Sequence, residues 1–210
     1  MSSHPMLDTT IQRFIARPLD SAGHALARTH ISANAITLLG AVLAIPLIVA
    51  LATRSYVMAL VLLALNRLLD GLDGAVARAT HRSPLGGYLD IVGDYVFYAG
   101  VPLGFALAAP TDNALPAATL LASFLLTCSS FLAYAALAAQ QGLKIEPERS
   151  KSFFYSRGLM EGTETIAFFI AMMLWPARFP SLASVFAVLC VLTALQRSAI
   201  AVWRFGRRAP

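Results

Sequence analysis

Charged residues are scarce in this chain. Asp, Glu, Lys and Arg together make up 13% of its 210 residues, whereas soluble domains carry roughly 25%. Hydrophobic residues make up 58%, and the mean hydropathy is +0.68. This balance excludes an ordinary soluble domain and indicates an integral membrane protein. No nucleic acid is expected among its partners.

The chain has few cysteines, and its first residues do not show the pattern of a cleaved leader. The two cysteines, Cys128 and Cys190, both fall within apolar runs, where a small buried hydrophobe is their expected role. A disulfide framework is therefore excluded. The first residues lack a short apolar core followed by a small-residue cleavage site, so we expect no cleaved signal peptide.

The apolar residues gather in six stretches, each long enough to cross a bilayer as a helix of about 20 residues. The approximate ranges are 33–53, 56–77, 87–109, 114–139, 158–176 and 181–203. Pro46 and Pro102 lie within the first and third stretches, where a membrane helix tolerates a kink. The sequence therefore predicts an all-α integral membrane protein with six transmembrane helices.

Basic residues favour the segments that would share one side of the membrane. Arg54 and Arg178 fall on the opposite side. The residues on the basic side are Arg13, Arg17, Arg28, Arg78, Arg82, Lys144, Arg149, Lys151, Arg157, Arg204, Arg207 and Arg208. Because cytoplasmic loops carry the excess of Lys and Arg, this pattern predicts that both termini are cytoplasmic. A bacterial inner (plasma) membrane is the expected location.

The N-terminal segment differs from the apolar stretches. Leu7 and Ile11 share a helical face that excludes the arginines, and Pro18 follows. This pattern predicts an interfacial amphipathic helix on the cytoplasmic leaflet, broken at the proline. We therefore expect a juxtamembrane segment over residues 1–30 and a six-helix membrane domain over residues 31–210.

Four of the 11 acidic residues lie close together between apolar flanks. Asp70 and Asp73 are three residues apart, and Asp90 and Asp94 are four apart, so each pair shares one face of a helix. The linker between the two helices is short, which makes the helices antiparallel neighbours. Both pairs lie near the cytoplasmic ends, so the four carboxylates can meet.

Clustered carboxylates in a low-dielectric site need cations to stay ionised. Mg²⁺ and Mn²⁺ prefer oxygen ligands, and two such ions can share bridging carboxylates while leaving positions open for phosphate oxygens. Arg78 would add a bidentate phosphate contact, and Gly74 and Gly86 would let a substrate approach the backbone. The alternative is an ion path, which predicts acids deeper in several spans, and spans one, four and six contain none.

Eight positions within 25 residues resemble the defining motif of the CDP-alcohol phosphotransferases. They are Asp70, Asp73, Gly74, Ala77, Arg78, Gly86, Asp90 and Asp94, in the spacing DxxDGxxAR, seven residues, GxxxDxxxD. The six-span layout, the amphipathic N-terminal segment and the ANAIT opening of the first span also resemble this family.

The resemblance implies a phosphatidyltransferase of phospholipid biosynthesis. Two Mg²⁺ or Mn²⁺ ions would hold the pyrophosphate of CDP-diacylglycerol at the cytoplasmic membrane surface. An acceptor hydroxyl would attack the phosphorus nearer the lipid, and CMP would leave. Asp70, Asp73, Asp90 and Asp94 match metal ligands, and Asp94 also matches the catalytic base. The positions that match the donor site are Asn34, Thr37, Gly74, Ala77, Arg78, Ser83 and Gly86. A homodimer is implied as well.

The acceptor is a small polar alcohol, and two interpretations stay open. Basic residues before the fifth span favour a phosphorylated acceptor, such as glycerol 3-phosphate or inositol phosphate, and we lean to this reading. A glutamate pair at the start of that span would favour serine, choline or ethanolamine. The candidate residues are Lys144, Arg149, Lys151, Arg157, Glu161 and Glu164. A further alternative exchanges the roles, with a CDP-aminoalcohol as the donor.

Overall fold

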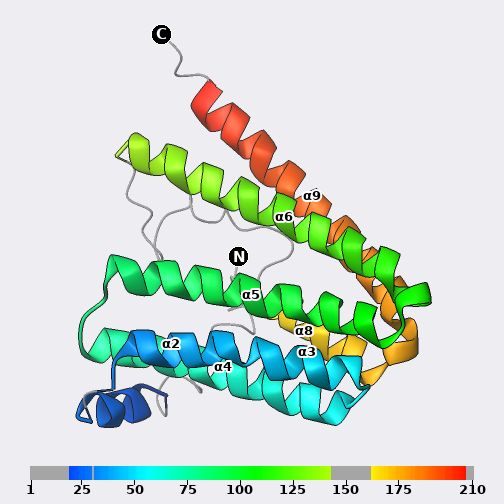
Figure 1. Ribbon diagram of the computed structural model, residues 1–210. Coiled ribbons are helices and arrows are strands. Elements are labelled where there is room, and N and C mark those ends of the chain that lie inside the picture. Colours follow the sequence, from blue (N-terminus) through cyan, green and yellow to red (C-terminus); the bar gives the residue numbers. More distant parts are fainter. Residues whose placement is uncertain (1–18, 30, 143–161, 207–210) are drawn as a thin grey trace, which may run out of the picture. The chain divides into compact units, whose positions relative to one another are not determined.

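The computed structural model describes residues 19–29, 31–142 and 162–206, and the regular elements in these ranges are helices (Figure 1). The chain forms two compact units that divide within one helix, between Val101 and Pro102. The apolar face predicted around Leu7 and most of the candidate acceptor residues lie outside the described ranges.

Each of the six apolar stretches corresponds to helix in the structure. The elements are α2 (Ala33–Val42), α3 (Ala44–Ala52), α4 (Tyr56–Ala79), α5 (Pro84–Ala108), α6 (Pro110–Gln140), α8 (Gly162–Leu174), the 3-10 turn η1 (Pro176–Arg178) and α9 (Phe179–Phe205). Residues 19–27 are also helical.

Within the described residues, four helical stretches are long and apolar enough to cross a membrane. They are Ala33–Ala52, Pro84–Ala108, Pro110–Gln140 and Pro176–Phe205. The helix α4 is not among them and carries the aspartate pair and two arginines, and the described part of α8 is 13 residues long. The all-α membrane fold is therefore confirmed, and the count of six spans stays a prediction.

The first span is broken between α2 and α3, at Leu43. Pro46 lies three residues further on, and a proline there has no N–H for the carbonyl of Val42 and crowds that carbonyl with its ring. Large apolar side chains such as Leu38 and Ile45 are exposed along this span. In a membrane protein, such side chains are suited to contact with lipid.

In the first unit, α5 packs against the first span through glycines seven residues apart. A Cβ on Gly93 would lie 3.3 Å from the Cβ of Ala41, and a Cβ on Gly100 would lie 3.3 Å from a side-chain carbon of Ile48. Small residues let membrane helices approach closely. This close approach brings the start of α5 beside α2, where the candidate site lies.

In the second unit, α6, α8 and α9 pack through aromatic side chains. Phe186 of α9 is fully buried and meets Phe124 of α6 edge-on at 5.2 Å between ring centroids. Phe168 of α8 stacks on the same ring at 4.6 Å. Aromatic pairs at these separations add about 0.5–1.5 kcal/mol each beyond the area they bury.

Candidate active site

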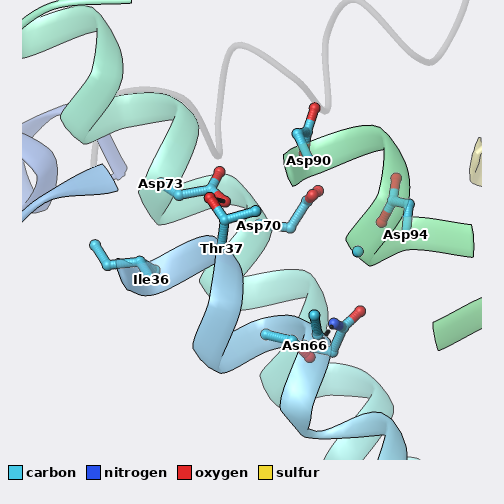
Figure 2. Close-up of a pocket in the computed structure, with 10 residues that line it drawn as sticks. Ile36, Thr37, Asn66, Asp70, Asp73, Asp90 and Asp94 are labelled. Carbon is cyan, nitrogen blue, oxygen red and sulfur yellow. Dashed lines mark hydrogen bonds between the residues drawn. The ribbon is translucent and has the colours of Figure 1, made fainter. Parts of the chain in front are cut away.

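Three of the four aspartates converge on one point. Carboxylate oxygens of Asp70 on α4 and of Asp90 and Asp94 on α5 all lie within 4.8 Å of one another. Figure 2 shows these side chains around a single small pocket that Asp73 also lines. Three carboxylates at this spacing match the hard oxygen donors that Mg²⁺ and Mn²⁺ prefer, so the residues present fit such an ion.

Asp73 is held slightly apart from the other three by a residue of α2. The hydroxyl of Thr37 donates to Asp73 Oδ2 at 2.6 Å and lies 3.0 Å from the carbonyl of Ala33. Hydrogen bonds to a charged acceptor are short and strong. The fourth aspartate therefore has a fixed orientation before any ligand arrives, and α2 supplies it.

The start of α5 is built as a helix N-terminus. Ser83 accepts a hydrogen bond from the backbone N–H of Gly86 at 3.0 Å, and Pro84 is the first helical residue. This is the N-cap arrangement that satisfies an otherwise orphaned amide. A Cβ on Gly86 would lie 3.1 Å from Asn34 Oδ1, so the glycine permits the approach of α2. The N-cap therefore fixes where α5 begins, and with it the position of Asp90 along the helix.

The predicted donor-site residues share one cleft of about 280 Å³. Its lining includes all seven of them, namely Asn34, Thr37, Gly74, Ala77, Arg78, Ser83 and Gly86. Asp73 and Asp90 line the same cleft, together with His81 and Arg82. The cleft therefore joins the carboxylates to a set of basic side chains, which suits a ligand that carries phosphate groups.

Arg78 is engaged by the helix that precedes the first span. Its Nη2 donates to Asp20 Oδ1 at 2.8 Å, and both side chains are almost half exposed. A Cβ on Gly23 would lie 2.6 Å from the Cβ of Ala75, so this helix packs directly on α4. The helix of residues 19–27 therefore contacts Arg78, one of the residues that line the cleft.

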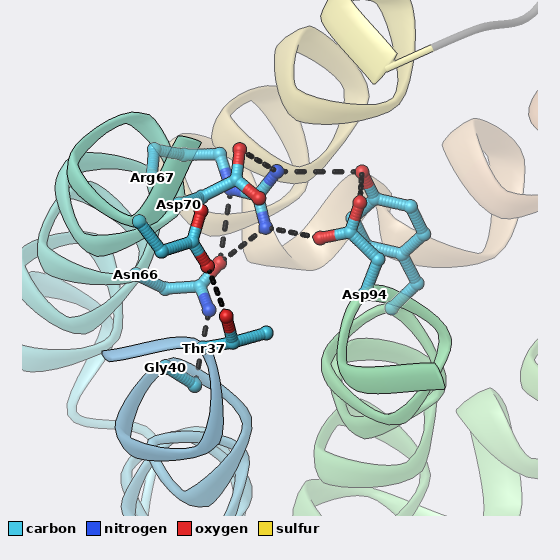
Figure 3. A network of polar contacts seen from close by, with 8 residues as sticks. Thr37, Gly40, Asn66, Arg67, Asp70 and Asp94 are labelled. Carbon is cyan, nitrogen blue, oxygen red and sulfur yellow. Dashed lines mark hydrogen bonds and ion pairs between the residues drawn. The ribbon is translucent and has the colours of Figure 1, made fainter. Parts of the chain in front are cut away.

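Sequence reasoning missed two arginines inside apolar helices. Arg67 on α4 pairs with Asp94 at 2.7 Å and with Asp70 at 3.5 Å, as Figure 3 shows. Arg197 on α9 is buried and donates to Ser130 Oγ at 3.1 Å. Both arginines could have been singled out from the sequence, because a charge within a membrane segment is costly and marks a functional or paired position.

Of the predicted acceptor residues, Glu164 lies within the described part of the chain. It is exposed in the first turn of α8. The five others, namely Lys144, Arg149, Lys151, Arg157 and Glu161, fall in the undescribed range 143–161. The proposed glutamate pair and the basic cluster therefore stay predictions.

Comparisons with known proteins agree with the motif. The sequence model of the CDP-alcohol phosphatidyltransferase family matches residues 30–203. The inner membrane protein YnjF of Escherichia coli K12 is 45% identical over 192 residues, which cover 91% of this chain and 93% of that protein. The archaetidylinositol phosphate synthase of Pyrococcus horikoshii is 31% identical over 116 residues, which cover 55% and 62% of the two chains.

Proposed function

This chain belongs to the CDP-alcohol phosphatidyltransferase family, and from that premise we propose that it transfers a phosphatidyl group from CDP-diacylglycerol to a phosphorylated alcohol. It is a membrane-embedded transferase of substituted phosphate groups in phospholipid synthesis. One observation carries the finer proposal: Asp90, one of the three converging carboxylates, lines the same cleft as Asp73 and the seven predicted donor-site residues.

Two divalent ions, Mg²⁺ or Mn²⁺, would be held by Asp70, Asp73, Asp90 and Asp94. When bound, they neutralise the pyrophosphate charge and make CMP a better leaving group. The chain's own residues orient the donor. Arg78 offers two N–H groups to a phosphate, and Gly74 leaves room for the donor beside α4.

Asp94 takes the proton in the transfer step. The acceptor oxygen forms a bond to the phosphorus that carries diacylglycerol, and the bond from that phosphorus to the oxygen of the CMP group breaks. The acceptor proton passes to an Asp94 oxygen, and CMP leaves with the electron pair. A carboxylate within hydrogen-bond reach of a hydroxyl is suited to this role.

The phosphorylated acceptor is supported by a relative and by charge. One relative is named for an inositol phosphate lipid, and four basic residues lie in the short connection before the fifth span. Glycerol 3-phosphate and inositol phosphate are the acceptors that we propose. Both would reach the site from the cytoplasm, the side on which the bias of Lys and Arg predicts both termini to lie.

The test is a panel of acceptors offered with labelled CDP-diacylglycerol to the purified protein. Glycerol 3-phosphate, inositol phosphate, serine, ethanolamine and choline are compared by CMP release and by the lipid formed. Turnover with a phosphorylated alcohol supports the proposal. Exclusive use of serine or choline would overturn the choice of acceptor.

A second measurement separates the two donor classes. A true donor stabilises the folded protein by mass action, since it binds the native state alone. CDP-diacylglycerol in mixed micelles is therefore expected to raise the unfolding temperature, and CDP-choline is not. The reverse result would exchange the roles of donor and acceptor.

Chemical cross-linking in native membranes tests the homodimer that the family likeness suggests.

A further inference from the structure

Arg67 places a positive charge inside the aspartate cluster. Its Nη2 lies 2.7 Å from Asp94 Oδ1, and its Nη1 lies 3.5 Å from Asp70 Oδ2. The Arg67 side chain is 22% exposed. One guanidinium therefore bridges the two helices through two of the carboxylates that converge on the proposed metal position (Figure 3).

The guanidinium is fixed from several directions. Its Nε donates to Asn66 Oδ1 at 2.9 Å, and Asn66 in turn donates to the carbonyl of Gly40 at 3.1 Å. Its central carbon lies 5.6 Å from the ring centroid of Tyr98 and 6.0 Å from that of Phe97. Contacts of this kind hold a planar guanidinium in one orientation. The Arg67 guanidinium therefore has a fixed position within the site.

Asp94 is fixed by the same group. Arg67 engages its Oδ1, and the Tyr98 hydroxyl lies 3.4 Å from its Oδ2. The Tyr98 hydroxyl also lies 3.4 Å from Arg67 Nη1. Both oxygens of the proposed base thus have a defined neighbour. The guanidinium sets the direction in which this carboxylate faces the other acids.

A resident cation has an electrostatic consequence for divalent ions. It offsets the mutual repulsion of the carboxylates when no metal is bound, and it repels a metal that binds to them. For a guanidinium on the order of 6 Å from a divalent ion, the repulsion even in high dielectric corresponds to about a tenfold loss of affinity.

We propose that Arg67 is the built-in counter-cation of the aspartate cluster, which positions Asp94 and sets how tightly the cluster binds divalent metal. The inference rests on the proposed metal-dependent function. It assigns to Arg67 a positioning role that acts through Asp94 and Asp70.

The experiment measures binding of Mn²⁺ alone to the full-length protein in detergent. Free Mn²⁺ is followed by electron paramagnetic resonance, and thermal unfolding is recorded with chelator and with Mn²⁺. Arg67→Gln is expected to bind Mn²⁺ about tenfold more tightly than the wild type. Its unfolding temperature in chelator is expected to fall, and Mn²⁺ is expected to restore it.

Two variants control for charge and for stability. Arg67→Lys keeps the charge and is expected to stay within about threefold of the wild-type Mn²⁺ affinity, because the repulsion persists. Arg204→Gln removes a guanidinium that bonds to Tyr134 in the second unit, and it is expected to leave Mn²⁺ affinity unchanged. If Arg67→Gln does not fold without metal, Arg67→Lys still decides the matter, since a tenfold change in its affinity contradicts the proposal.

The outcomes separate this inference from the proposed function. Mn²⁺ binding by the wild type, with equal or weaker binding by Arg67→Gln, would leave the metal site intact and overturn the role of Arg67. A wild type that binds no Mn²⁺ would overturn both. Lower stability of Arg67→Gln with unchanged Mn²⁺ affinity would reduce Arg67 to a structural residue.

Discussion

Asp20 and Arg78 form an ion pair across 58 residues of sequence, with Arg78 Nη2 donating to Asp20 Oδ1 at 2.8 Å. Arg78 belongs to the motif and lines the cleft, whereas Asp20 lies on the helix before the first span. The pair therefore gives that helix a direct contact with the proposed donor site. An acidic side chain here also competes with a phosphate for the same guanidinium.

Asp20→Asn is expected to lower the KM for the donor. An ion pair between two half-exposed side chains is worth about 0.2–1 kcal/mol, so its removal should lower the KM for CDP-diacylglycerol by up to about fivefold. The unfolding free energy should fall by less than about 1 kcal/mol. Steady-state CMP release against donor concentration measures the first effect. A raised KM would mean that Asp20 orients Arg78 rather than competing with the donor.

Gly23→Ala is expected to displace the N-terminal helix from α4. The added Cβ would meet the Cβ of Ala75 at 2.6 Å and its backbone carbonyl carbon at 2.8 Å, and overpacking of this kind costs about 1–3 kcal/mol. Gly87→Ala is the matched control, because a Cβ there has nothing within 4 Å and gains helix propensity. Thermal unfolding of both variants checks the difference. Equal stability would contradict the close packing.

Asp94→Asn is expected to abolish CMP release while the protein still folds. Loss of a general base lowers kcat by about 100-fold to 10,000-fold, and an asparagine keeps the shape of the side chain. Release of labelled CMP at saturating substrates measures the loss, and size-exclusion chromatography reports the fold. Near-normal turnover would show that another group takes the acceptor proton.

Thr37→Val is expected to free Asp73 from its fixed orientation. The lost bond, 2.6 Å from hydroxyl to carboxylate, is of the charge-assisted type worth about 1.5–3 kcal/mol. Thr37→Ser keeps the hydroxyl and should restore most of the stability and activity. The comparison uses unfolding temperature and the metal concentration that gives half-maximal turnover. If valine and serine behaved alike, the hydroxyl would have no part in holding Asp73.

Chelation of divalent ions is expected to stop turnover reversibly. At a metal concentration 100 times Kd, binding to the native state alone adds about 2.7 kcal/mol to the free energy of unfolding. Addition of EDTA should therefore lower the unfolding temperature and halt CMP release, and Mg²⁺ or Mn²⁺ should restore both. Full activity in excess EDTA would remove the metal-dependent mechanism.

The helices and the aspartate pairs were accessible from the sequence because their signals are local. Apolar runs of sufficient length indicate membrane helices wherever they occur. The spacing of Asp70 to Asp73 and of Asp90 to Asp94 puts each pair on one face. The break at Leu43 was not predicted, because Pro46 was expected to be tolerated within one continuous span, although the proline three residues later accounts for it.

The partners of the charged residues needed the tertiary structure. Thr37 to Asp73, Arg67 to Asp94 and Asp20 to Arg78 join positions 36, 27 and 58 residues apart. Which of these side chains meet depends on how closely α2, α4, α5 and the helix of residues 19–27 pack, and glycines such as Gly93 and Gly23 control that distance. The sequence by itself determined the helical membrane fold and the positions of the four aspartates along it. Only the packing of the helices decided that Arg67 pairs with Asp94 and Asp70.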